Sequence, residues 1–161
     1  MSREITCCFT GHRHLGSDFK KENLKGAIEN LIEKGVKIFI AGGALGFDTE
    51  AALEVLRQKK AGKDVALHIY APCNNQAVRF SFKEKWIYKK ILKHADYVDM
   101  PPQPYFNGCM KIRNYKMVDA SSYVIAYYTG EFKSGTGQTV RYAQRSGLEI
   151  TNLCTNLKED F

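Results

Sequence analysis

Apolar segments of strand length alternate along this chain with segments that have helical periodicity. The apolar runs cover about residues 4–9, 36–41, 65–71, 95–100, 122–128 and 148–153. Before the second run, Leu24, Ile28 and Leu31 recur at three- and four-residue steps, with Asp18 as the expected helix cap and Gly35 as the expected stop. Strands separated by helices are joined by right-handed crossovers. The pattern therefore predicts an α/β fold, a single three-layer domain with a mainly parallel sheet of about six strands and helices on both faces.

Composition narrows the class of protein. A chain of 161 residues with 44% hydrophobic content predicts one domain over residues 1–161. Five cysteines, of which only Cys7 and Cys8 are close together, form neither a disulfide framework nor a metal pair, so a reducing cytoplasm is expected. No apolar run approaches the roughly 18 residues needed to span a bilayer, so no membrane association is expected. The net charge of +7 suits phosphate-bearing partners, although most lysines fall on expected helix surfaces.

Two glycine-rich turns follow apolar strands and open helical segments. The first contains Gly42, Gly43 and Gly46, and the second lies within residues 129–139. Glycines let main-chain N–H groups approach an anion at a helix N-terminus. Because ligands of parallel sheets bind beyond the carboxyl ends of the strands, we expect these turns and the loop of residues 10–13 to share one crevice. The loops predict a nucleotide-like ligand.

Other readings of the first turn remain open. The Gly42-Gly43-x-x-Gly46 spacing differs from the dinucleotide fingerprint and follows the second strand, which disfavours hydride transfer with a nicotinamide cofactor. The glycines also suit a tight strand-to-helix turn. Asp48 is placed either to accept hydrogen bonds from ribose hydroxyls or to stabilise the helix dipole.

Four motifs together resemble the YpsA-like branch of the SLOG superfamily, which includes the LOG phosphoribohydrolases and the DprA DNA-processing proteins. They are Phe9-Thr10-Gly11-His12-Arg13, Gly42 to Asp48, Arg113-Asn114-x-x-Met117-Val118-Asp119, and Ser134-Gly135-Thr136-Gly137-Gln138-Thr139. The resemblance covers nearly the whole chain. It implies a Rossmann-like fold, a bacterial origin and binding of a nucleotide derivative, with ADP-ribose or NAD as the leading ligands and no cofactor required.

The expected ligand-binding residues come from these motifs and loops. They are Thr10, Gly11, His12, Arg13, Gly42, Gly43, Gly46, Asp48, Arg113, Asn114, Ser134, Gly135, Thr136, Gly137 and Thr139. Backbone N–H groups of both glycine loops would bind phosphates, Arg13 and Arg113 would add charge-assisted contacts, and Asp48 would bind a ribose. No catalytic residue is assigned and no metal site is expected, since the two histidines at residues 12 and 14 lack further grouped ligands.

The resemblance also bears on catalysis. The LOG motifs pair an arginine, matched here by Arg113, with a glutamate, whose place is taken by Arg141. Cleavage of a glycosidic bond builds positive charge on the sugar, which a guanidinium opposes. Glu131 precedes the loop and is a weak substitute. A sensor or adaptor without strong catalysis is therefore favoured over a phosphoribohydrolase-like enzyme or a DprA-like single-stranded nucleic-acid binder. A homo-oligomer remains possible.

Aromatic residues leave two further questions open. Tyr127 and Tyr128 end a strand, so one side chain should enter the core while the other is free to stack on a base. Phe82 and Trp86 lie among basic residues, as on a nucleic-acid surface, but their helical spacing favours core packing.

The last helix is expected over residues 139–146.

Overall fold

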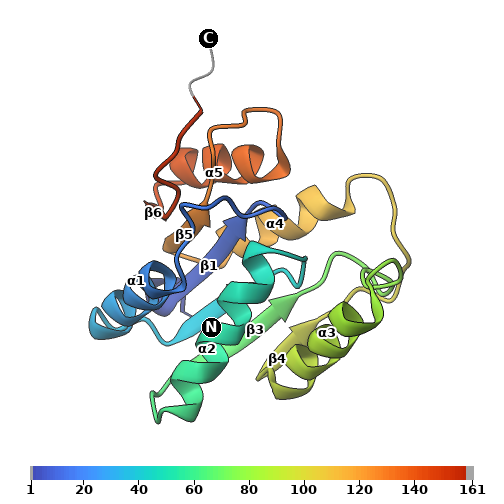
Figure 1. The fold of residues 1–161 in the computed structure, drawn as a ribbon, viewed down its shortest axis with the longest axis horizontal. Helices are drawn as coiled ribbons and strands as arrows, with labels where there is room; N and C mark the ends of the chain where they lie inside the picture. Colours follow the sequence, from blue (N-terminus) through green and yellow to red (C-terminus); the bar gives the residue numbers. More distant parts are fainter. Residues whose placement is uncertain (1, 159–161) are drawn as a thin grey trace.

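A computed structural model describes residues 2–158 and contains one six-stranded, all-parallel sheet (Figure 1). The strands are β1 (Thr6–Gly11), β2 (Ile38–Ala41), β3 (Ala66–Tyr70), β4 (Tyr97–Asp99), β5 (Tyr123–Tyr127) and β6 (Glu149–Asn152). The helices are α1 (Lys21–Glu33), α2 (Phe47–Lys60), α3 (Phe82–His94), α4 (Cys109–Asp119) and α5 (Gly135–Arg145), and a 3-10 turn, η1, spans Arg3–Ile5. The predicted α/β class is confirmed.

The strand order of the sheet reverses direction next to β1. From β1 the chain moves outward through β2 and β3 to β4, and α4 then carries it back to β5 on the other side of β1. The order β4-β3-β2-β1-β5-β6 thus reverses direction between β1 and β5. In open parallel sheets, ligands bind at the carboxyl ends of strands near such a reversal.

The two faces of the sheet are covered by different helices. Helices α1, α2 and α3 lie side by side on one face, and α4 and α5 pack together on the other (Figure 1). Alternate strand residues point to opposite faces, so Phe9 and Ile125 join the core under α1–α3 while Cys8 and Val124 join the core under α4 and α5. Burial on both faces explains why the central strands β1, β2 and β5 read as continuous apolar runs, whereas the edge strands β4 and β6 are more exposed.

The start of α1 differs from the sequence prediction, whereas its end does not. The N-cap is Lys20, without a side-chain cap, so the assignment of Asp18 as the cap is wrong. Asp18 instead accepts hydrogen bonds from the Tyr127 hydroxyl at 2.6 Å and from the Thr155 N–H at 2.9 Å. These bonds hold the pKa of Asp18 well below its usual range. Gly35 follows the helix at φ +101°, which confirms it as the stop.

Helix α5 begins at Gly135, four residues before the predicted start at residue 139. The Ser134 hydroxyl caps it by accepting a hydrogen bond from the Gly137 N–H at 2.9 Å. Capping outweighs the low helix propensity of the two glycines in the first turn.

The prediction that Phe82 and Trp86 pack in the core is wrong. Phe82 is 91% exposed and Trp86 is 61% exposed, on the outer side of α3. Their four-residue spacing does place them on one face, but Ile91 rather than either ring is the buried residue of this helix. Helical periodicity identifies a shared face without telling which way that face points.

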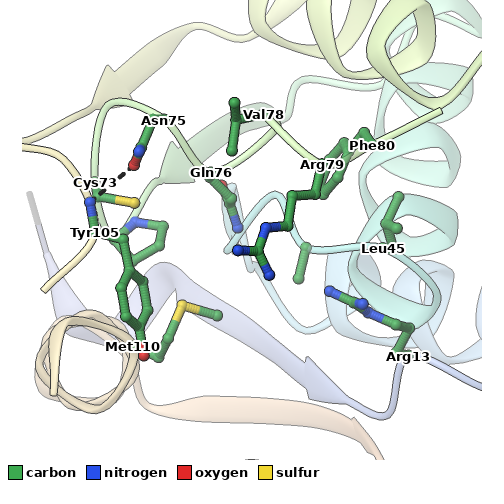
Figure 2. Close-up of a pocket in the computed structure, with 12 residues that line it drawn as sticks. Arg13, Leu45, Cys73, Asn75, Gln76, Val78, Arg79, Phe80, Tyr105 and Met110 are labelled. Atoms are coloured by element: carbon green, nitrogen blue, oxygen red, sulfur yellow. Dashed lines mark hydrogen bonds between the residues drawn. The ribbon is translucent and has the colours of Figure 1, made fainter. Parts of the chain in front are cut away.

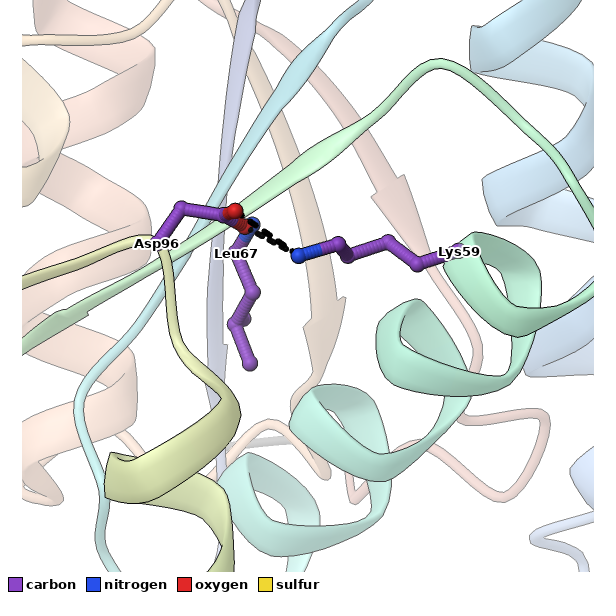
Figure 3. A network of polar contacts seen from close by, with 3 residues as sticks. All are labelled: Lys59, Leu67 and Asp96. Atoms are coloured by element: carbon purple, nitrogen blue, oxygen red, sulfur yellow. Dashed lines mark hydrogen bonds and ion pairs between the residues drawn. The ribbon is translucent and has the colours of Figure 1, made fainter.

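An ion pair fixes α2 to the opposite, amino-terminal edge of β3 (Figure 3). The Asp96 carboxylate accepts hydrogen bonds from Lys59 Nζ at 2.7 and 2.8 Å and from the Leu67 N–H at 2.8 Å. Burial opposes ionisation of Asp96, but these hydrogen bonds outweigh it and lower the pKa of the carboxyl group. No helix within residues 2–158 combines the length and apolar character required to cross a bilayer.

Candidate functional site

A cavity of about 660 Å³ opens at the carboxyl edge of β2 and β3 (Figure 2). Four loops surround it: the loop after β1, the glycine turn before α2, the segment between β3 and α3, and the proline-rich segment between β4 and α4. The first turn of α4 completes the lining through Met110. Its lining residues are Arg13, Ala44, Leu45, Pro72, Cys73, Asn75, Gln76, Val78, Arg79, Phe80, Tyr105 and Met110. The volume lies in the range of about 300–1,000 Å³ that is typical of small-molecule sites.

Hydrogen bonds between loops build the wall of this cavity. The Tyr105 N–H donates to Asn75 Oδ1 at 2.8 Å, and the Asn74 N–H donates to the Gln103 carbonyl at 2.8 Å. These two bonds attach the proline-rich segment to the loop after β3. Gln76 Nε2 also donates to the Gly42 carbonyl at 3.2 Å, which attaches the same loop to the glycine turn. The wall is therefore assembled from loops that are distant in sequence.

Two arginines supply the charge of the cavity. Arg13, from the loop after β1, and Arg79, from the loop before α3, point toward the same space (Figure 2). Neither takes part in an ion pair with any residue in the described range 2–158. The remaining lining is apolar or neutral. A pair of unneutralised guanidinium groups beside apolar walls suits an anionic ligand with a planar or apolar portion.

Gly42, Asp48 and Arg113 form a buried cluster beneath the cavity. Arg113, 5% exposed, donates from Nη1 to the carbonyls of Gly42 at 2.5 Å and Tyr70 at 3.1 Å, and from Nε to Asn114 Oδ1 at 2.8 Å. A Cβ on Gly42 would lie 2.6 Å from Arg113 Nη1 and 2.8 Å from Asp48 Oδ2. The guanidinium of Arg113 thus binds the ends of β2 and β3, and Gly42 lets it and Asp48 approach.

Burial dominates the electrostatics of this cluster. Desolvation raises the pKa of Asp48 to about 6, although the nearby Arg113 guanidinium and the Ala44 N–H favour its ionised form. Desolvation likewise lowers the pKa of Arg113, and Asp48 opposes that shift. Each charge is therefore held in the interior largely by the other.

Close contacts account for Gly11, at the end of β1, and Gly46, in the turn after β2. Gly46 has φ +83°, and a Cβ there would lie 2.1 Å from the Arg13 carbonyl oxygen. A Cβ on Gly11 would lie 2.5 Å from the Phe47 ring. The structure thus brings the predicted residues of the first two loops together, with Arg13 as the predicted residue that lines the cavity.

The second glycine loop lies apart from this cavity. None of its residues from Ser134 to Thr139 is among the lining residues. A Cβ on Gly137 would lie 2.8 Å from the Glu131 carbonyl oxygen, and Thr136 and Thr139 are buried. Arg141 donates to the Phe132 carbonyl at 2.9 Å and stacks on the Phe132 ring. Local packing therefore accounts for most of this loop.

The loops after β1 and β5 meet at the reversal point of the sheet. His12 Nε2 accepts a hydrogen bond from the Thr129 N–H at 3.1 Å, and burial lowers the pKa of His12. Thr10 is buried at the end of β1. Tyr127 enters the core, as one of the two tyrosines was expected to do, while Tyr128 is half-buried near the His12 ring. The histidine thus orders the loop and is neutral near pH 7.

Sequence reasoning missed the residues after β3 as part of a site. Asn75, Gln76 and Arg79 all follow a strand that ends at the same edge as β2. A polar segment after a buried strand was the available signal, but it carries no glycine motif. Within residues 2–158, no three histidine, cysteine, aspartate or glutamate side chains gather closely enough to hold a metal ion.

Solved structures with the same fold come from another group of proteins. The chain superposes with a TM-score of 0.67 on DNA processing protein A from Helicobacter pylori, which binds single-stranded DNA, at 20% identity. It superposes equally well on DNA processing protein A from Streptococcus pneumoniae at 16% identity. The matches cover 92% and 91% of this chain but 64% and 49% of those proteins. At such identities the likeness supports the fold alone.

Comparison with known protein sequences assigns this chain to a family. The chain is 33% identical over 141 residues to the SPbeta prophage-derived protein YoqJ of Bacillus subtilis, a match that covers 80% of this chain and 82% of YoqJ. It is 29% identical over 119 residues to the UPF0398 protein BH1768 of Halalkalibacterium halodurans, covering 73% of this chain and 63% of that protein. Residues 3–156 match the YpsA family, described as the YspA SLOG family. With these matches and the parallel-sheet fold, the chain belongs to the YpsA family of SLOG proteins.

Proposed function

We propose that the cavity beside the first glycine loop binds a nucleotide derivative, with ADP-ribose and NAD as the leading candidates, and that the protein acts as a sensor or adaptor. The observation that carries this proposal is the pairing of Arg13 and Arg79 over a cavity of about 660 Å³. Two guanidinium groups suit a diphosphate, because each matches phosphate oxygens in a planar fork. Phe80, Leu45 and Tyr105 offer apolar surface for a base or sugar.

The composition of the lining supports binding over hydrolysis. Among the twelve residues that line the cavity, none is an aspartate or glutamate. Glycosidic cleavage needs a carboxylate beside the sugar. Asp48 is buried beneath the cavity, and Glu131 lies on the loop after β5 outside the lining. The position of the LOG glutamate is occupied by Arg141, whose guanidinium stacks on Phe132. A phosphoribohydrolase-like activity therefore remains the weaker alternative.

A thermal-shift panel tests the proposal. Wild type, Arg79→Ala and Arg145→Ala would be melted with ADP-ribose, NAD, AMP or ATP at fixed salt. A ligand at about 100 times its dissociation constant stabilises the protein by roughly 2.7 kcal/mol, which raises the melting temperature by about 5–10 °C for a domain of this size. We expect Arg79→Ala to lose the shift and Arg145→Ala, an exposed arginine at the end of α5, to keep it.

Chromatography of the same mixtures separates a sensor from an enzyme. Intact ligand after prolonged incubation supports the sensor, whereas release of ribose or a base supports hydrolysis. If no nucleotide shifts the wild type, or if Arg79→Ala retains a full shift, the cavity is not the binding site and the proposal fails.

A further inference from the structure

The outer face of α3 exposes two large aromatic rings that the fold does not use. Phe82 is 91% exposed and Trp86 is 61% exposed, one helical turn apart. The sequence pattern predicted that they would be buried. Exposing rings of this size to water is unfavourable, so a pair of them on one helical face marks a surface for a partner.

The charges on the helix that carries these rings are mostly positive. Helix α3 carries five lysines and one glutamate. The glutamate, Glu84, is engaged in the capping box, where its carboxylate accepts a hydrogen bond from the Ser81 N–H at 2.7 Å. Among ion pairs within residues 2–158, five use a lysine outside α3 and none uses a lysine of α3. The positive charge of this helix is therefore not neutralised by the rest of the fold, and its partner should be anionic.

Rings and charges lie along the same line. Spacings of four, four and three residues place one side of α3 in the order Phe82, Trp86, Lys90 and Lys93. Lys90 Nζ lies 5.4 Å from the centre of the Trp86 ring. At 1.5 Å per residue, the distance from residue 82 to residue 93 is about 16 Å. A stripe of that length is longer than one nucleotide, so a polymeric anion covers it better than a small molecule.

We propose that this aromatic–basic stripe on α3, which consists of Phe82, Lys83, Trp86, Lys89, Lys90 and Lys93, binds single-stranded nucleic acid. The lysines would contact successive phosphates while unpaired bases stack on the two rings. A duplex offers the phosphates but keeps its base faces stacked inside. An acidic peptide offers charge but no regular series of planar faces.

The fluorescence of Trp86 tests the stacking step, because it is the single tryptophan of the chain. Titration with an oligothymidylate should quench its emission, and the observed association constant should fall with salt. With three or four phosphates neutralised, the slope of log K against log salt concentration should be about −2 to −3. Binding of the full chain would be measured in parallel by the anisotropy of a labelled oligonucleotide.

Variants separate stacking from charge. Phe82→Ala and Trp86→Ala should each weaken oligonucleotide binding by about 5- to 100-fold. The Lys89→Ala/Lys90→Ala double variant should weaken it and make the salt slope less steep. Matched controls at exposed positions elsewhere, Ile112→Ala on α4 and Lys25→Ala on α1, should bind within about twofold of wild type. All these side chains are exposed, so the far-ultraviolet circular dichroism of the variants should match that of wild type.

Several results would overturn the proposal. Absence of oligonucleotide binding at low salt is one, and equal affinity for duplex DNA or heparin with unchanged Trp86 emission is another. A concentration-dependent dimer that is lost in Phe82→Ala would assign the stripe to a second copy of the chain. Arg79→Ala should leave oligonucleotide binding within about twofold of wild type, which distinguishes failure of the stripe from failure of the cavity proposal.

Discussion

The sequence resemblance assigns Arg113 to ligand binding, whereas its contacts assign it to stability, and one substitution separates the two roles. Arg113→Met keeps the aliphatic length of the side chain and removes the guanidinium. In the folded protein this removes the Arg113 donor from the buried Tyr70 carbonyl, leaves the Gly42 carbonyl with Gln76 Nε2 as its side-chain donor, and leaves Asp48 without its nearby positive charge. The variant should therefore unfold more easily even when no ligand is present.

The size of the effect follows from these lost contacts. A buried acceptor left unsatisfied costs about 1–3 kcal/mol, and removing one member of a buried charge pair costs about 3–5 kcal/mol. We expect a loss of about 3–5 kcal/mol at pH 8, a large part of the 5–15 kcal/mol that stabilises a typical domain.

The loss should depend on pH because Asp48 can take up a proton. Its pKa is raised to about 6 in the folded protein, from 3.8, so its protonation stabilises the fold at low pH. That contribution is fully present below about pH 4 and is lost as pH rises through about 6, amounting to roughly 3 kcal/mol for a shift of about two units. Without Arg113, the pKa of Asp48 should rise further. At pH 5 the carboxyl group is then neutral, and the penalty should fall to that of the hydrogen bonds lost at the Gly42 and Tyr70 carbonyls, about 1–3 kcal/mol.

Urea unfolding followed by circular dichroism at pH 5 and pH 8 measures the cost of the lost carbonyl hydrogen bonds and the additional cost of the unpaired Asp48 charge. Asp48→Asn should flatten the pH dependence, and combining it with Arg113→Met in a double-mutant cycle should give a coupling that is larger at pH 8 than at pH 5. Arg145→Met serves as the exposed control. A loss below about 1 kcal/mol at pH 8, together with abolished ligand binding, would refute the structural role of Arg113 and restore the role that the sequence predicted.

Three further predictions concern the scaffold. Gly46→Ala should lower the free energy of unfolding in urea by at least about 2 kcal/mol, because φ is +83° and the new Cβ would meet a backbone carbonyl of the loop after β1. Its control, Gly26→Ala, lies inside α1 with open space around it and should raise that free energy by about 0.5–1 kcal/mol. Asp96→Asn should lower stability near neutral pH, and the difference from wild type should shrink as pH falls below about 4. The reason is that the lowered pKa gives Asp96 a stabilising contribution that exists only in its ionised form. An equal loss of stability at pH 3 and pH 7 would contradict the ion pair of Figure 3. Tyr127→Phe should cost about 1–2 kcal/mol in thermal unfolding through loss of its hydrogen bond to Asp18, and a neutral result would indicate that water replaces that bond.

Much of the fold could be predicted because it depends on local pattern. Apolar runs and helical repeats identified six strands and five helices, and the glycines at residues 35 and 46 marked turns that require positive φ. The errors arose where distant contacts decided the outcome. Asp18 resembles a helix cap, yet hydrogen bonds from Tyr127 and Thr155, more than 100 residues away in the chain, hold it elsewhere.

The candidate site was predicted less completely. The loops after β1 and β2 do meet, and Arg13 lines the cavity. Arg79 was not recognised because it belongs to no local sequence motif. Arg113 was recognised by its motif, yet a motif cannot show whether a guanidinium faces a ligand or the carbonyls of its own sheet.

The sequence alone determined the alternation of strands and helices, the parallel sheet that this alternation requires, and the loops at its carboxyl edge, because period and turn chemistry are properties of neighbouring residues. Only the tertiary structure decided which of those loops enclose a cavity and which face of α3 is buried. Those outcomes depend on which surfaces pack against one another, and packing joins residues that the chain keeps far apart. The exposed rings of Phe82 and Trp86 show the difference most clearly, since the same spacing suits a buried face or an outward one.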